Sequence, residues 1–176
     1  MSKARLVTVS FASVAAGLCI GLFAKEKLPG IEVIHGKPPK EAGLAALQEA
    51  EHVAGKGTWE LIAIARVYYL TGDHAKAQEL IERALSHKPK ATDFQRVAEL
   101  YSDAGDNAQA EAYFAKALAA DPDDDTGQSE IGAWYIRHGQ RDQGEVLVAK
   151  ALDKNPSEAW HYIRASEALL AVPPGR

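Results

Sequence analysis

The sequence predicts an all-α protein: an antiparallel helix-turn-helix solenoid that is preceded by one transmembrane helix. Two observations predict this class. A repeat of eighteen residues occurs three times, at 72–89, 105–122 and 139–156, and the copies differ mainly at positions expected on the surface. A stretch of nineteen residues without a charged side chain precedes it, at 6–24. The repeated segment indicates a packing unit, and the uncharged stretch indicates a membrane helix.

The uncharged stretch at 6–24 follows a short tail, residues 1–5, that contains Lys3 and Arg5. As a helix it would be about 28 Å long, close to the hydrocarbon thickness of a bilayer. A cleaved secretory signal, with its best cleavage site after Ala16, is the rival interpretation, and a buried helix of a soluble body is the third. From the layout of span, linker and repeats we expect a single-pass protein of a bacterial inner membrane, and from the flanking charges a body in the periplasm. If the segment is cleaved, we expect a secreted periplasmic protein.

Small residues recur every four positions within this stretch, at Ser13, Gly17 and Gly21. This spacing lets two membrane helices approach closely, so a homodimer through these residues is one hypothesis. Residues 25–40 then hold Pro and Gly at short intervals, which break helices and predict a linker. The solenoid is expected to fill residues 41–176.

Each copy of the repeated segment belongs to a unit of 33 or 34 residues, because tyrosines and prolines recur at the same intervals as the opening glycines. Apolar residues at spacings of three and four precede and follow each glycine. Each unit is therefore a helix, a tight turn at Gly, an antiparallel helix and a turn marked by Pro. We expect units at about 58–90, 91–124 and 125–158.

Two further helices are predicted at the ends of the repeats. Residues 41–55 contain Leu44, Leu47 and Ala50 at helical spacing, like the second helix of a degenerate unit. Residues 157–171 form a closing helix in which Tyr162, Ala165 and Leu169 continue the phase of the repeats. The body is thus expected to hold eight helices, in about four pairs that curve slightly.

The units resemble the tetratricopeptide repeat, whose pattern is W-x2-L-G-x2-Y, then A-x3-F-x2-A, then P. The resemblance covers Thr58 to Pro156 and departs from the pattern at the first Trp of every unit, where Leu61, Phe94 and Gln128 stand. Because Gln128 matches worst, the first helix of the third unit is expected to start late or to pack loosely there. The resemblance implies that the protein binds other proteins and catalyses no reaction.

Composition excludes several other functions. With 47% hydrophobic residues the chain can bury a real core, and its net charge of −4, without a basic stripe, argues against nucleic acid as a partner. The single cysteine, Cys19, rules out an internal disulfide framework and any Cys-Cys zinc site.

No catalytic, cofactor or metal site is predicted. The acidic segment 121–130 has Thr126 and Gly132 where a calcium loop of the EF-hand type needs Gly and Glu, so it is interpreted as a turn with helix-starting carboxylates. The six histidines are scattered, with none paired at metal-ligand spacing, and no Gly-rich phosphate loop or nucleophile elbow is present. We therefore expect no enzyme and no cofactor.

The resemblance implies a partner-binding groove lined by first-helix residues that lie off the packing positions. A peptide segment or a helix of a partner would lie in this groove. The clamp for a C-terminal carboxylate that is known in the family is not expected, because Arg66 and Arg96 alone supply the charge and Glu99 opposes it. The predicted groove residues are Trp59, Ile62, Arg66, Tyr69, Gln95, Glu99, Ser102, Ser129, Ile136, Trp160 and Ile163.

Two of these residues have a structural alternative: Trp59 is covered by the helix at 41–55, and Trp160 seals the last unit. Trp134, in contrast, is expected in the core, because Val67 and Leu100 are its equivalents. The leading hypothesis is a membrane-tethered scaffold that binds partner proteins on its groove. The alternatives are an assembly factor for a bacterial envelope complex, of the cytochrome maturation or pilus biogenesis type, and a structural protein that self-associates through its ends.

Overall fold

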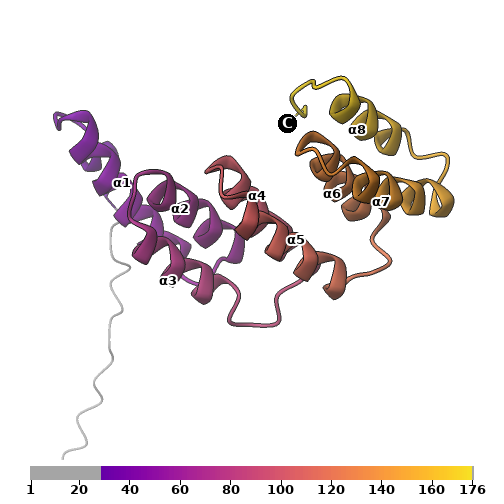
Figure 1. Ribbon diagram of the computed structural model, residues 1–176. Coiled ribbons are helices and arrows are strands. Elements are labelled where there is room, and N and C mark those ends of the chain that lie inside the picture. Colours follow the sequence, from indigo (N-terminus) through magenta and orange to yellow (C-terminus); the bar gives the residue numbers. More distant parts are fainter. Residues whose placement is uncertain (1–28, 176) are drawn as a thin grey trace, which may run out of the picture.

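The computed structural model describes residues 29–175, and in this part of the chain it contains eight α-helices, one short 3-10 helix and no strand. The predicted all-α class is therefore confirmed. Figure 1 shows the helices arranged as successive antiparallel pairs. Their bounds are η1 Ile31–Val33, α1 Pro39–Ala54, α2 Thr58–Leu70, α3 His74–Ala84, α4 Ala91–Asp103, α5 Asn107–Ala120, α6 Asp125–Arg137, α7 Arg141–Lys154 and α8 Ala159–Leu169.

The turn inside each pair is made by the glycine that opens the repeated segment. Gly72, Gly105 and Gly139 have φ of 93°, 77° and 81°, a left-handed conformation that glycine adopts without the strain a Cβ would cause. In the first two pairs the next residue is an aspartate, Asp73 or Asp106, whose side chain accepts a hydrogen bond from the backbone N–H three residues on. The glycine thus ends one helix and the aspartate starts the next.

The first helix of the body begins slightly earlier than predicted. Pro39 is the first residue of α1, although the linker was expected to reach residue 40. Proline is tolerated there because the first N–H of a helix has no partner inside the helix. Within α1 only Leu47 is buried; Leu44 and Ala50 are exposed.

The apolar residues that precede and follow each opening glycine at spacings of three and four, predicted as the packing positions of the paired helices, form the core. Those of the first helices are buried apart from Phe94, which is partly buried against the core, and those of the second helices are all buried. The small residues let the helices cross closely. A Cβ on Gly132 would lie 2.8 Å from the carbonyl oxygen of Gly144, and a Cβ on Gly144 would lie 2.6 Å from Cγ1 of Ile136.

The third pair starts where its predecessors do, so the expected late or loose start of its first helix was wrong. The side chain of Asp124 caps α6 by accepting a hydrogen bond from the backbone N–H of Gly127 at 2.9 Å. Gln128 is buried, and its Nε2 donates to the carbonyl of Pro122. Because this hydrogen bond satisfies the amide, a polar residue fits at a position where the repeat usually has an apolar one.

The face that α8 buries also differs from the prediction. Tyr162 and Leu169 are about half exposed, whereas His161 and Ala168 are buried. The predicted face is the one that a second helix of the same unit would cover, and no such helix follows α8 among the described residues. Instead α8 packs on α6, which lies on its other side.

The stack of pairs is open at one place. Helix α4 packs closely against α2, but α6 touches α4 at only a few positions, and Figure 1 shows α6, α7 and α8 as a group set apart from α2–α5. Polar side chains link the two groups. Gln140 Nε2 donates to Glu111 Oε2 at 3.3 Å, and Trp134 Nε1 donates to Ser102 Oγ at 2.8 Å.

The localisation predicted from the sequence, a single-pass inner-membrane protein, is contradicted. Among residues 29–175 no helix is both long and apolar enough to cross a membrane. The longest, α1, has 16 residues and carries several charged side chains, while a span needs about 20 mainly apolar residues. The stretch at 6–24, and the contact through Ser13, Gly17 and Gly21 within it, lie outside the described residues.

Candidate functional site

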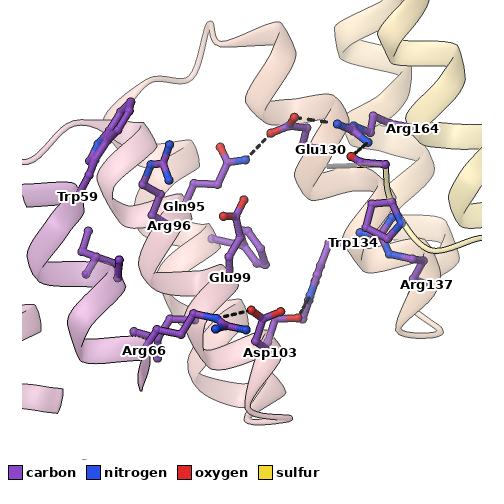
Figure 2. A pocket seen from close by; sticks show the side chains of 17 residues that line it. Trp59, Arg66, Gln95, Arg96, Glu99, Asp103, Glu130, Trp134, Arg137 and Arg164 are labelled. Atoms are coloured by element: carbon purple, nitrogen blue, oxygen red, sulfur yellow. Dashed lines mark hydrogen bonds and ion pairs between the residues drawn. The ribbon is translucent and has the colours of Figure 1, made fainter. Parts of the chain in front are cut away.

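A cleft of about 630 Å³ lies where the stack is open. Figure 2 shows its two walls, one carried by α2 and α4 and the other by α6 and α8. Pro174 and Gly175 form part of the second wall. The lining residues are Trp59, Ile62, Ala63, Arg66, Gln95, Arg96, Glu99, Leu100, Ser102, Asp103, Phe114, Glu130, Trp134, Arg137, Arg164, Pro174 and Gly175.

Six of the predicted groove residues line this cleft, and all six lie on α2 or α4. They do not play equal parts. Ile62 is buried and belongs to the floor, whereas Trp59 and Glu99 are exposed. The six residues are Trp59, Ile62, Arg66, Gln95, Glu99 and Ser102.

Five predicted residues lie elsewhere, and three of these are buried or partly buried. Tyr69 donates its hydroxyl to Asp106 Oδ2 at 3.1 Å and packs edge-on against Tyr101. Ser129 is buried and its hydroxyl has no hydrogen-bond partner among the described residues. Ile136 lies over Gly144 at the crossing of α6 and α7.

The two remaining residues are on α8. Trp160 and Ile163 are exposed at 55% and 38%, but they do not line the cleft. The guanidinium of Arg164 lies 5.2 Å from the centroid of the Trp160 ring. Since more than half of Trp160 is open to solvent, it does not seal the last unit as the structural alternative suggested.

Trp59 is held by α4. Its Nε1 donates to Asp93 Oδ1 at 3.0 Å, and Cζ of Arg96 lies 3.8 Å from the centroid of its ring. The side chain is nevertheless 52% exposed, so helix α1 does not cover it. One hydrogen bond and one cation–π contact thus fix an aromatic ring at the rim of the cleft.

The floor of the cleft is apolar and aromatic. Ile62, Leu100, Phe114 and Trp134 line it and are each buried. The ring centroids of Phe114 and Trp134 are 4.9 Å apart. Trp134 is therefore a core residue, as predicted, and it also forms part of the cleft.

Most charges of the cleft are paired. Arg66 Nε lies 2.6 Å from Asp103 Oδ2, and Arg164 reaches Glu130 at 3.8 Å and Glu167 at 3.0 Å. Gln95 Nε2 adds a hydrogen bond to Glu130 across the cleft, as Figure 2 shows. These contacts define the rim without filling the space between the walls.

Apart from Arg96, which lies on the Trp59 ring, two charged groups of the cleft have no ion-pair partner among residues 29–175. Nη1 of Arg137 is buried without any hydrogen-bond partner, and burial lowers the pKa of this guanidinium. On the opposite wall, Glu99 keeps part of its surface in solvent, but the desolvation of its carboxylate by the surrounding residues of the cleft, and next the carboxylate of Glu130, raise its pKa. A ligand with polar groups of its own could satisfy both.

Pro174 and Gly175, which follow α8, line the cleft. Arg164 Nη1 donates to the carbonyl of Gly175 at 3.1 Å, and the backbone N–H of Gly175 donates to Glu167 Oε1 at 3.1 Å. The hydrogen bond from Gly175, and then Arg164, lower the pKa of Glu167. This wall of the cleft therefore already binds a stretch of peptide backbone.

Sequence reasoning missed the second wall. Arg137 and Arg164 are ordinary helix-surface residues in the sequence, and no pattern marks the place where α6 separates from α4. The only feature in the sequence that could have indicated this wall is that both residues are positively charged and lie on the same side of their helices, α6 and α8. The face they share becomes accessible because the stack opens there.

The acidic segment 121–130 serves the start of α6 in the structure. Asp124 caps the helix, and Asp125 Oδ2 lies 3.2 Å from Nε2 of the buried His161 on α8. Within residues 29–175 no group of three His, Cys, Asp or Glu side chains is placed to hold a metal ion. Two of these carboxylates thus start α6 and join it to α8.

Comparisons with known proteins agree with this architecture. Two family models of the tetratricopeptide repeat match the chain, one over residues 60–93 and one over 101–167. The crystal structure of MamA is similar, with a TM-score of 0.51 and 15% sequence identity over 75% of this chain and 80% of that chain. At this identity the likeness shows the fold alone. No curated protein matches the sequence.

These matches support the predicted repeat fold, and proteins with such repeats generally bind other proteins. The matches give no support to a membrane tether, to a homodimer, or to the two alternative roles in envelope-complex assembly and end-to-end self-association.

Proposed function

We propose, from the premise that this chain carries tetratricopeptide repeats, that it is a scaffold that binds a segment of another protein in the cleft between α4 and α6. Repeats of this kind generally bind proteins rather than catalyse reactions. Solenoids use the surface left by their curvature for this purpose. In this chain the opened stack supplies a cleft of about 630 Å³.

The observation that supports the cleft most strongly is its combination of an aromatic floor with unpaired charges. Trp, Tyr and Arg are the residue types that dominate the energetics of protein interfaces, and Trp134, Trp59 and Arg137 all line this one cavity. A buried guanidinium group without a partner costs free energy, which a carbonyl or carboxylate of the ligand would recover.

The experiment that tests this function compares two alanines. Ala63 is exposed on α2 and lines the cleft, while Ala115 is exposed on α5 and does not. A photo-crosslinking amino acid is placed at either position in the full chain, in cells that produce the protein. We expect a defined crosslinked partner from position 63 and none of the same mass from position 115.

The partner is then identified by mass spectrometry and purified, so that its affinity for the unmodified chain can be measured. A crosslinked product that forms equally well from both positions would place binding outside the cleft. The same conclusion would follow if the purified partner failed to bind the unmodified chain.

A further inference from the structure

We propose that the cleft recognises an extended, proline-containing segment, and that the chain's own residues 172–175 occupy the α8 side of this site until a partner displaces them. This inference rests on the proposed function and specifies the chemistry of the partner. The partner segment would resemble Val-Pro-Pro-Gly in having an extended backbone with few N–H groups.

The chain reverses its direction directly after α8. Ala171 has φ of 53°, a left-handed conformation that is unfavourable for a residue with a Cβ. The backbone N–H of Val172 donates to the carbonyl of Glu167 at 2.8 Å, which completes the reversal. The following residues are thereby directed back along α8, and Pro174 and Gly175 reach the cleft.

Two side chains of α8 then bind the backbone of Gly175. Arg164 donates to its carbonyl and Glu167 accepts from its N–H, both at 3.1 Å, and the same two side chains lie 3.0 Å from each other. Their side chains are only 19% and 15% exposed. One donor and one acceptor held side by side can pair with the C=O and N–H of any residue except proline, which has no N–H, so this contact selects backbone rather than a particular side chain.

Proline explains why such a segment suits the cleft. Pro173 and Pro174 have no N–H, and consecutive prolines favour the extended polyproline conformation even before binding, which lowers the entropy cost of docking. Grooves lined by aromatic side chains are a known way to bind such segments. Trp134 and Phe114 supply aromatic rings on the floor of the same cleft that Pro174 enters.

The tail covers one side of the cleft and leaves the rest open. Arg137 and Glu99 have no ion-pair partner among residues 29–175 while the tail is docked, so the tail does not use the whole site. A longer segment of a partner could use the Arg164–Glu167 pair together with these charges. It would have to displace a tail that is attached to α8 and is therefore present at a high effective concentration.

The test uses a defined probe, a fluorescent peptide of sequence AVPPGR, which corresponds to residues 171–176. Binding is measured by fluorescence anisotropy with the full chain and with a chain that lacks residues 172–176. We expect the shortened chain to bind the peptide about tenfold more tightly than the full chain, because the attached tail no longer competes. A peptide AVAAGR should bind more weakly than AVPPGR.

Variants of the shortened chain show whether the peptide occupies the proposed position. Glu167→Gln removes the charged acceptor and Arg164→Ala removes the donor, so each should weaken peptide binding. Arg141→Ala is the matched control, because Arg141 is exposed on α7 and pairs only with Glu145. Circular dichroism of each variant confirms that its helices are intact.

Two results would overturn the inference: no binding to the shortened chain up to millimolar peptide, or equal binding by the shortened and full chains. Equal binding of AVPPGR and AVAAGR would overturn the part played by proline. These outcomes are separate from the proposed function, which is tested by crosslinking from positions 63 and 115 and by the binding of the purified partner.

Discussion

The indole Nε1 of Trp134 on α6 donates a hydrogen bond of 2.8 Å to the hydroxyl of Ser102 on α4. Trp134 is 5% exposed and its ring is part of the cleft floor. Because α6 otherwise touches α4 at few positions, this bond is one of the direct links that hold the two walls at their observed separation.

Ser102→Ala should destabilise the protein and loosen the cleft. The substitution leaves the buried indole N–H without its partner, which typically costs about 1–3 kcal/mol. Urea denaturation gives the change in the free energy of unfolding. Ser166→Ala is the control, since its exposed hydroxyl bonds only carbonyls of its own helix. Equal stability of the two variants would mean that the Trp134–Ser102 bond does not hold the walls.

Gly144→Ala should destabilise the third helix pair. A Cβ there would lie 2.6 Å from Ile136 Cγ1 and 2.9 Å from its backbone N, so α6 and α7 would have to move apart. Overpacking of this kind costs about 1–3 kcal/mol. Gly43→Ala in α1, where a Cβ would meet no atom within 4 Å, should instead stabilise by about 0.5–1 kcal/mol. The melting temperatures of the two variants are compared with that of the parent. If both variants shift the melting temperature in the same direction, the close crossing of α6 and α7 at Gly144 is contradicted.

Glu99→Gln should raise the melting temperature at neutral pH. Burial and Glu130 raise the pKa of Glu99, so the folded chain binds this proton more readily than the unfolded chain. The free energy of unfolding therefore falls as the pH rises through the raised pKa. At low pH, where the parent carboxyl is protonated, the melting temperatures of parent and variant should converge. If the parent instead has the higher melting temperature at neutral pH, the ionised Glu99 carboxylate is stabilised in the folded chain, and the account of it as a charge without an ion pair is contradicted.

The helices and the core could be predicted because each follows from local chemistry. Gly72, Gly105 and Gly139 end their helices through a backbone conformation that depends on the residue itself, and the small residues beside each tyrosine set the crossing of a pair. These features repeat with the same spacing, so they are visible in one sequence. Trp134 was placed in the core because Val67 and Leu100 are its equivalents; it is buried like Leu100, although Val67 is 41% exposed.

The site could be predicted only in part, because it depends on how neighbouring pairs stack. Tyr69 and Ile136 occupy equivalent groove positions in the family. In this chain Tyr69 packs against Tyr101, and Ile136 packs over Gly144. For α8, packing on α6 decides which face is buried, and the sequence of α8 alone does not show this contact. The separation of α6 from α4 arises from the sum of many contacts, and no single residue marks it in the sequence.

The most direct test of the account is the affinity of the crosslinked partner for two tryptophan variants. Ala63→Trp places an indole inside the cleft, whereas Ala115→Trp places one on the exposed surface of α5. With both variants fully helical, we predict that Ala63→Trp weakens partner binding at least about tenfold, which is about 1.4 kcal/mol, and that Ala115→Trp leaves it unchanged. Unchanged affinity for Ala63→Trp would contradict the claim that the partner binds in this cleft.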